Sequence, residues 1–122
     1  MAERLVFVLT TGLNSPGVTR ATLMFSAISA AMDVETTLFC VQDGAEIMVR
    51  GALDNEESTP GTPTIKQRLE EAIEAGVEIL VCEQTMRVKG ISEDELIEEA
   101  KVSGAATLID LALEARNVLC LG

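Results

Sequence analysis

The chain has 122 residues, of which 48% are hydrophobic, and this is enough apolar material for the core of one domain of common size. Its 20 acidic and 9 basic residues give a formal net charge of -11, which argues against nucleic acid or an anionic membrane surface as a partner. Histidine is absent and the three cysteines are far apart, so histidine-based metal sites and a disulfide framework are excluded. We expect a single domain over residues 1–122, with free thiols, no metal site and no cofactor.

The N-terminal segment begins with Met1 and Ala2 and contains one short apolar run, LVFVLTTG. It lacks the basic region, the long apolar stretch and the cleavage site of a signal peptide, and the run is too short to span a membrane. We therefore expect a cytoplasmic protein.

The first half of the chain predicts a strand, a helix, a second strand and a short helix. Residues 4–10 and 35–41 are aliphatic and β-branched runs typical of buried strands. Between them, apolar residues recur three and four positions apart, as on one face of a helix: Val18, Ala21, Phe25, Ile28 and Met32. Small residues at positions 26, 27, 29 and 30 keep this helix slim enough to lie close to a sheet or a neighbouring subunit. Residues 42–51 predict a turn and a short helix.

The second half opens with a polar segment, DNEESTPGTP at 54–63, which predicts a mobile loop. A helix follows, for which Thr62 is the expected N-cap, Pro63 suits the first turn and Gly76 fits the C-terminal cap. The remaining elements are a strand at 77–82, a short acidic helix with a capping box at Ser92–Glu95, a strand at 98–104, a helix at 105–115 and a last strand at 117–122.

Strands that alternate with helices at this spacing predict an α/β fold with a mostly parallel sheet covered by helices on both faces. In such sheets, ligands and reactive groups gather at the carboxyl ends of the strands. Cys82 lies at such an end, in the sequence ILVCEQTM.

Cys82 is either the last buried residue of a strand or a reactive thiol. The residues after it, EQTMRVKG, can form a helix whose first amide groups would favour a negatively charged sulfur, and Arg87 and Lys89 bring positive charge nearby in sequence. From spacing alone, both interpretations stay open. Cys40 and Cys120 lie within predicted strands, and we expect both to be packed as small core residues.

Other polar residues are expected at the same edge of the sheet. The loop after the first strand contributes Thr11, Gly12, Asn14 and Ser15; Asp43 and Gly44 follow the second strand, and Gln84 follows Cys82. These residues are candidates for lining a pocket. The loop could bind an anion through backbone amides at a helix N-terminus, but it lacks a recognised phosphate-binding motif, and an ordinary turn in which Gly and Pro serve backbone geometry is the favoured interpretation. The acidic pairs further along are expected to be solvated helix faces.

Three segments together resemble the DsrE/DsrF-like family of small sulfur-relay proteins of the TusD and YchN types. They are VEILVCEQTMRVKGI, the upstream DGAEIM and the C-terminal GAATLIDLALEARNVLCLG. The resemblance extends over nearly the whole chain. It implies a three-layer α/β/α sandwich around a five-stranded, mainly parallel sheet, and assembly into trimers or hexamers.

The resemblance also implies a function, because the active cysteine of the family corresponds to Cys82. The expected protein is a sulfur carrier or sulfurtransferase that holds sulfane sulfur as a persulfide and exchanges it with donor and acceptor proteins. The aliphatic composition agrees with a homo-oligomer. The alternative is a non-catalytic oligomeric subunit or a protein that binds a small ligand or anion on the same scaffold, with Cys82 merely packed.

Overall fold

The structure, a computed structural model, describes residues 3–122, so Met1 and Ala2 of the N-terminal segment considered above lie outside the described residues. Within residues 3–122, the strands form one five-stranded sheet in which all neighbours are parallel, in the order β4-β3-β2-β1-β5. The strands are β1 Arg4–Leu9, β2 Glu35–Cys40, β3 Glu78–Cys82, β4 Ala100–Ser103 and β5 Asn117–Cys120. The predicted α/β fold with a five-stranded parallel sheet is confirmed.

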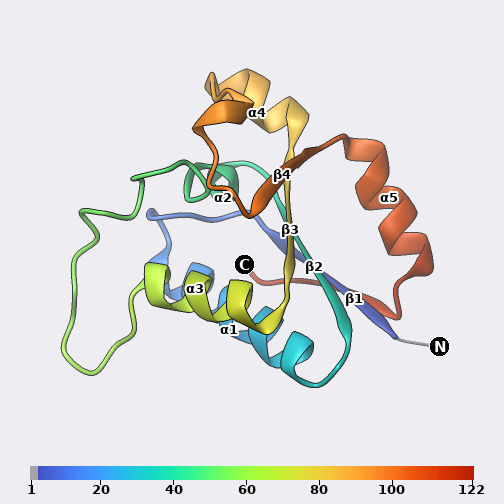
Figure 1. The fold of residues 1–122 in the computed structure, drawn as a ribbon, viewed down its shortest axis with the longest axis horizontal. Coiled ribbons are helices and arrows are strands. Elements are labelled where there is room, and N and C mark those ends of the chain that lie inside the picture. Colours follow the sequence, from blue (N-terminus) through green and yellow to red (C-terminus); the bar gives the residue numbers. More distant parts are fainter. Residues whose placement is uncertain (1–2) are drawn as a thin grey trace.

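Helices cover both faces of this sheet, as Figure 1 shows. They are α1 Pro16–Ala31, α2 Asp43–Glu46, α3 Ile65–Ala75, α4 Glu83–Lys89 and α5 Ala105–Glu114, with a 3₁₀ turn, η1, at Glu93–Glu95. The alternation of side chains along β3 assigns the layers. Ile79 and Val81 belong to the main core with α3, whereas Leu80 and Cys82 pack against α5 on the other face.

The main core lies between the sheet and the pair α1 and α3. It is almost entirely aliphatic, with Leu9, Leu38 and Val81 from the strands and Leu23 and Ile65 from the helices, all at most 1% exposed. The strands read as continuous apolar runs because helices cover the sheet on both sides.

The face of helix α1 that packs against the core is not its apolar stripe. Its buried residues are Thr19, Thr22, Leu23, Ser26 and Ser29. Their hydroxyls are satisfied locally: Thr19 Oγ1 donates to the Gly12 carbonyl at 2.8 Å, and Ser26 Oγ donates to the Leu23 carbonyl at 2.8 Å. These small side chains let α1 lie close to the sheet, in line with the prediction that this helix is slim.

As a consequence, the apolar stripe of α1 points to solvent in the isolated chain. Phe25, Ile28 and Met32 are 43%, 48% and 69% exposed. The 3.6-residue periodicity therefore marks an apolar surface and not the packing face of the helix.

The N-terminus of α3 differs from the sequence prediction. Thr64, and not Thr62, is the N-cap: its Oγ1 accepts from the Gln67 N–H at 3.1 Å, and the Gln67 side chain accepts from the Thr64 N–H at 2.8 Å. This reciprocal pair is a capping box, which satisfies two helix-end amides at once, whereas Thr62 belongs to a tight turn with Thr59. The predicted cap at Gly76 is confirmed, with φ of 99°.

We expect Thr64→Ala to lower the free energy of unfolding by about 1 kcal/mol, because it removes the cap of α3. Thr62→Ala is the matched control, since its side chain does not cap the helix, and it should stay within about 0.5 kcal/mol of the wild type. Urea unfolding followed by circular dichroism measures both. Equal losses in the two variants would contradict the assignment of the cap.

The C-terminal elements follow the predicted order with two differences. The capping box at Ser92 is present, but η1 is one 3₁₀ turn and not a longer helix, since Leu96 is already extended and Ile97 donates to the Met48 carbonyl. The last strand, β5, is an edge strand whose residues are all exposed. Cys120 is therefore exposed, and the prediction that it is packed in the core is wrong. None of the helices in the described part of the chain has the length and apolar character of a membrane span.

Candidate functional site

Cys82 is the junction between β3 and α4. It is the last residue of the strand and the N-cap of the helix, with extended backbone angles of -65° and 121°. Its strand neighbour on one side is Ser103 of β4. The sequence prediction of a thiol at the carboxyl edge of the sheet, followed directly by a helix, is thus confirmed as a placement.

The surroundings of Cys82 are apolar. It forms a small cluster with Phe39 and Leu80, and side chains of Val41, Leu108 and Leu111 pack against this cluster. The cysteine is 6% exposed in the isolated chain. Access to the sulfur is therefore limited by α5, the helix that carries Leu108 and Leu111.

The two cations expected near Cys82 are engaged elsewhere. Arg87 forms an i, i+4 ion pair with Glu83 at 2.9 Å. Lys89 reaches Asp43 at 2.9 Å and Glu46 at 3.4 Å. The expectation that these side chains supply charge to the thiol is therefore not supported by their geometry.

The Lys89 network connects the end of α4 to α2. The hydrogen bond from Lys89 holds the pKa of the Asp43 carboxyl below its usual value, and the same bond raises the pKa of Lys89. Asp43, a predicted pocket residue, is thus a structural partner of α4.

A strained turn connects β2 to α2. The Gly44 N–H donates to the Val41 carbonyl at 2.9 Å, and Gln42 between them has φ of 52° and ψ of -133°, as at the first central position of a type II′ turn. The Gln42 N–H also donates to Thr85 Oγ1 of α4 at 3.2 Å. Sequence reasoning missed Gln42, because the Asp43-Gly44 pair is the stronger turn signal and glycine is the residue expected at positive φ.

The predicted pocket glycines have a packing role. A Cβ at Gly44 would lie 2.2 Å from the Leu9 carbonyl oxygen, and a Cβ at Gly12 would lie 2.5 Å from the Asp43 carbonyl oxygen. These glycines let the loop after β1 and the start of α2 approach each other closely.

The remaining residues of the first loop mostly bind one another. Thr11 Oγ1 and Thr19 Oγ1 are 2.7 Å apart, Asn14 Oδ1 accepts from the Gly12 N–H at 3.0 Å, and the Ser15 N–H donates to the Gly12 carbonyl at 3.2 Å. These bonds favour the ordinary-turn interpretation over an anion cradle.

Of the predicted pocket residues, Asn14 lines a cavity of about 510 Å³ at this edge of the sheet. Glu46, Lys89 and Gly90 also line it, but Cys82 does not. Gln84 is exposed on α4. The structure therefore brings Asn14 close to the C-terminal end of α4, whereas Cys82 lies at the N-terminal end of this helix, outside the cavity.

The other two cysteines differ sharply. Cys40 is fully buried in the main core, where burial strongly raises the pKa of its thiol, as expected of a packed residue. Cys120 is exposed on the edge strand β5. Cys40 and Cys82 are thus both buried, at 0% and 6% exposed, and Cys120 is open to solvent.

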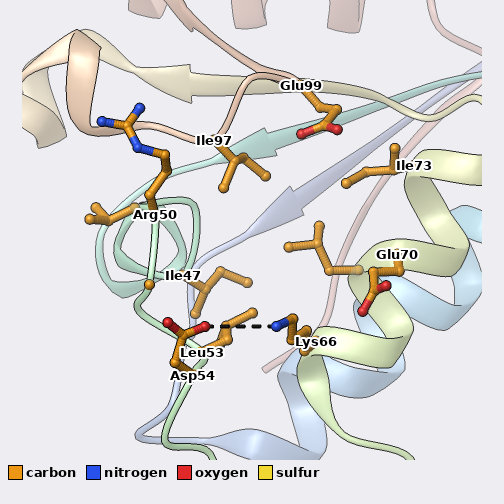
Figure 2. Close-up of a pocket in the computed structure, with 12 residues that line it drawn as sticks. Ile47, Arg50, Leu53, Asp54, Lys66, Glu70, Ile73, Ile97 and Glu99 are labelled. Atoms are coloured by element: carbon orange, nitrogen blue, oxygen red, sulfur yellow. Dashed lines mark ion pairs between the residues drawn. The ribbon is translucent and has the colours of Figure 1, made fainter.

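A second hollow of about 290 Å³ lies between the segment after α2 and helix α3, as Figure 2 shows. Its walls include aliphatic side chains such as Leu53 and Ile97, with Arg50 and the Lys66–Asp54 ion pair of 3.7 Å at its rim. It contains no residue of the predicted site. Within residues 3–122, no group of three or more cysteine, aspartate or glutamate side chains could hold a metal ion.

The fold is similar to those of two solved structures. The chain is similar to the ychN protein from E. coli, with a TM-score of 0.81 and 20% identity over 98% of this chain and 99% of that one. It is also similar to MTH1491 from Methanobacterium thermoautotrophicum, with a TM-score of 0.69 and 22% identity, covering 98% and 99% of the two chains.

Sequence relatives are archaeal and uncharacterised. MJ0760 from Methanocaldococcus jannaschii is 29% identical over 108 residues, which is 88% of this chain but 39% of MJ0760. MJ0989 from the same organism is 27% identical over 97 residues, covering 80% of this chain and 81% of MJ0989. The sequence model of the DsrE/DsrF-like family matches residues 3–121. The chain therefore belongs to the DsrE/DsrF-like family.

Proposed function

We propose that this protein carries sulfane sulfur as a persulfide on Cys82 and exchanges it with donor and acceptor thiols in the cytoplasm. The observation that supports this most is the position of Cys82, at the carboxyl end of a central strand and directly before a helix, in a chain of the DsrE/DsrF-like family. Parallel sheets gather reactive groups at this edge.

The proposed chemistry needs only a thiolate. The Cys82 sulfur attacks the outer sulfur of a donor such as thiosulfate, the S–S bond of the donor breaks, and sulfite leaves with the bonding electron pair. The product is a persulfide anion on Cys82. An acceptor thiolate then attacks the outer sulfur, forms a new persulfide and releases Cys82 as thiolate.

Access for the donor requires movement of α5, because Leu108 and Leu111 pack against the Cys82 cluster. No residue of α5 is itself buried, and the half-buried Leu108 and Leu111 are its contacts with the cluster that contains Cys82, so this helix is held less tightly than α1 or α3. We therefore assign the opening of the site to α5.

The proposal is tested by incubating the protein with thiosulfate, polysulfide or a persulfidated desulfurase and then measuring its intact mass. The wild type should gain sulfur that a reductant removes. Absence of any gain with all three donors would overturn the proposal.

A second candidate is a non-catalytic oligomeric subunit or small-ligand binder, and the low exposure of Cys82 favours it. Alkylation of the native protein separates the two candidates. A carrier requires Cys82 to react well ahead of the fully buried Cys40, whereas a merely packed Cys82 should react as slowly as Cys40.

We also propose that the chain forms a homo-oligomer, with a trimer or hexamer ahead of a dimer. The exposed stripe of Phe25, Ile28 and Met32 joins Leu119 and Leu121 around an almost wholly apolar hollow of about 430 Å³. An exposed apolar surface of this kind on a small acidic chain is typical of an interface.

The expected result for this assembly is a mass of several chains by light scattering at micromolar concentration. Ile28→Glu, which puts a charge into the apolar stripe, should shift the mass toward the monomer, because burying an unpaired carboxylate is costly. A monomeric wild type would contradict the proposed assembly.

A further inference from the structure

Gln42 has a side chain where glycine would be favoured. Its φ of 52° and ψ of -133° lie in a region that residues with a Cβ rarely adopt, and the Gly44 N–H bond to the Val41 carbonyl fixes the turn. A glycine would adopt the same turn without strain. A residue with a long side chain therefore occupies this position in spite of the local backbone preference.

Within the described residues, the Gln42 side chain neither packs in the core nor forms a hydrogen bond. Gln42 is exposed, and within residues 3–122 its carboxamide makes no hydrogen bond to another residue. The one bond that Gln42 gives to α4, to Thr85 Oγ1 at 3.2 Å, comes from the backbone N–H, which a glycine would provide equally. Strain of this kind clusters at functional sites.

Gln42 lies next to the Cys82 cluster. The residue before it, Val41, packs against the cluster of Phe39, Leu80 and Cys82. Its backbone partner Thr85 is three residues after Cys82 in α4. Gln42 is thus at the edge of the candidate site, in the turn that follows β2, and β2 is the neighbour of β3, the strand that ends in the thiol.

We propose that the carboxamide of Gln42 binds the anionic sulfane donor as it approaches Cys82, an inference that rests on the proposed persulfide function. Amide N–H groups form strong hydrogen bonds to anions. A neutral side chain is suited to this position, because a donor such as thiosulfate carries two negative charges and the protein carries a net charge of -11. Gln42 is therefore a binding residue for the donor, and Cys82 remains the nucleophile.

The placement of Gln42 is tested with two alkylating reagents of similar size, neutral iodoacetamide and anionic iodoacetate. In a Cys120→Ser background, Gln42→Glu should lower the ratio of the iodoacetate rate to the iodoacetamide rate at Cys82 by roughly threefold or more, since a carboxylate near the thiol repels only the anion. Gln42→Ala should change this ratio less. A ratio unchanged by Gln42→Glu would overturn the inference.

The role of the side chain is tested with Gln42→Gly. Relief of backbone strain should raise the Tm by roughly 3–5 °C, while sulfur loading from thiosulfate becomes slower, as it should also in Gln42→Ala. A Gln42→Gly variant that loads sulfur as fast as the wild type would overturn the inference. If the wild type itself takes up no sulfur, the persulfide function fails, and the reagent ratio still decides whether Gln42 lies at the thiol.

Discussion

Gly44→Ala is expected to destabilise the protein by about 3 kcal/mol or more, at the upper end of the cost of overpacking. The new methyl group would lie 2.2 Å from the Leu9 carbonyl oxygen and 2.9 Å from Leu9 Cγ. The closest of these atoms belongs to the backbone of β1, which is fixed by the sheet and cannot rotate away. Relief of the clash therefore requires α2 and the strained turn at Gln42 to move.

Urea unfolding measures this loss, and Gly17→Ala is the matched control. Gly17 is in α1, and a Cβ there would meet no atom within 4 Å. Alanine is favoured over glycine in helices, so the control should be neutral or more stable by up to about 1 kcal/mol. A Gly44→Ala variant as stable as the wild type would show that the close approach of α2 to β1 is wrong.

Cys82→Ser is expected to abolish the uptake of reductant-labile sulfur. Serine is close in size and keeps the strand-to-helix junction, but its hydroxyl forms no persulfide. Cys120→Ser should load as the wild type does, although Cys120 is exposed, and Cys40→Ala should also load because Cys40 is buried in the main core. Intact mass measured with and without reductant compares the variants, and sulfur uptake that persists in Cys82→Ser would exclude the assigned residue.

The architecture could be predicted because the strong signals are local. The apolar runs that became β1, β2 and β3 stop where turn residues or a helix begin, and the regular alternation with helices leaves a parallel sheet as the natural solution. The position of Cys82 at the carboxyl edge followed from the same pattern. Gly76 was recognised as a C-cap because a helix end with positive φ favours glycine.

Other features could not be predicted because they depend on tertiary contacts. The apolar stripe of α1 indicates a packing face, yet small hydroxyl residues face the core, since they can bond to nearby carbonyls and let the helix approach closely. The exposure of Cys120 follows from the position of β5 at the edge of the sheet, which a single strand pattern does not reveal.

Features of the candidate site that depend on tertiary contacts could not be predicted from the sequence either. Arg87 and Lys89 are near Cys82 in sequence, but their carboxylate partners decide where the charges lie, and Asp43 is 46 residues from Lys89. The positive φ of Gln42 is set by the turn between β2 and α2 and by the hydrogen bond of its N–H to Thr85 of α4, and the residue type gives no signal for it.

Locating the added sulfur in the wild-type protein shows directly which cysteine carries the persulfide. Cleavage after lysine and arginine puts the three cysteines on separate peptides, so each thiol can be assessed after loading, trapping of persulfides with an alkylating reagent and mass spectrometry. The reductant-labile sulfur should be on the peptide that contains Cys82. Sulfur found on the Cys120 peptide, with none on the Cys82 peptide, would contradict it.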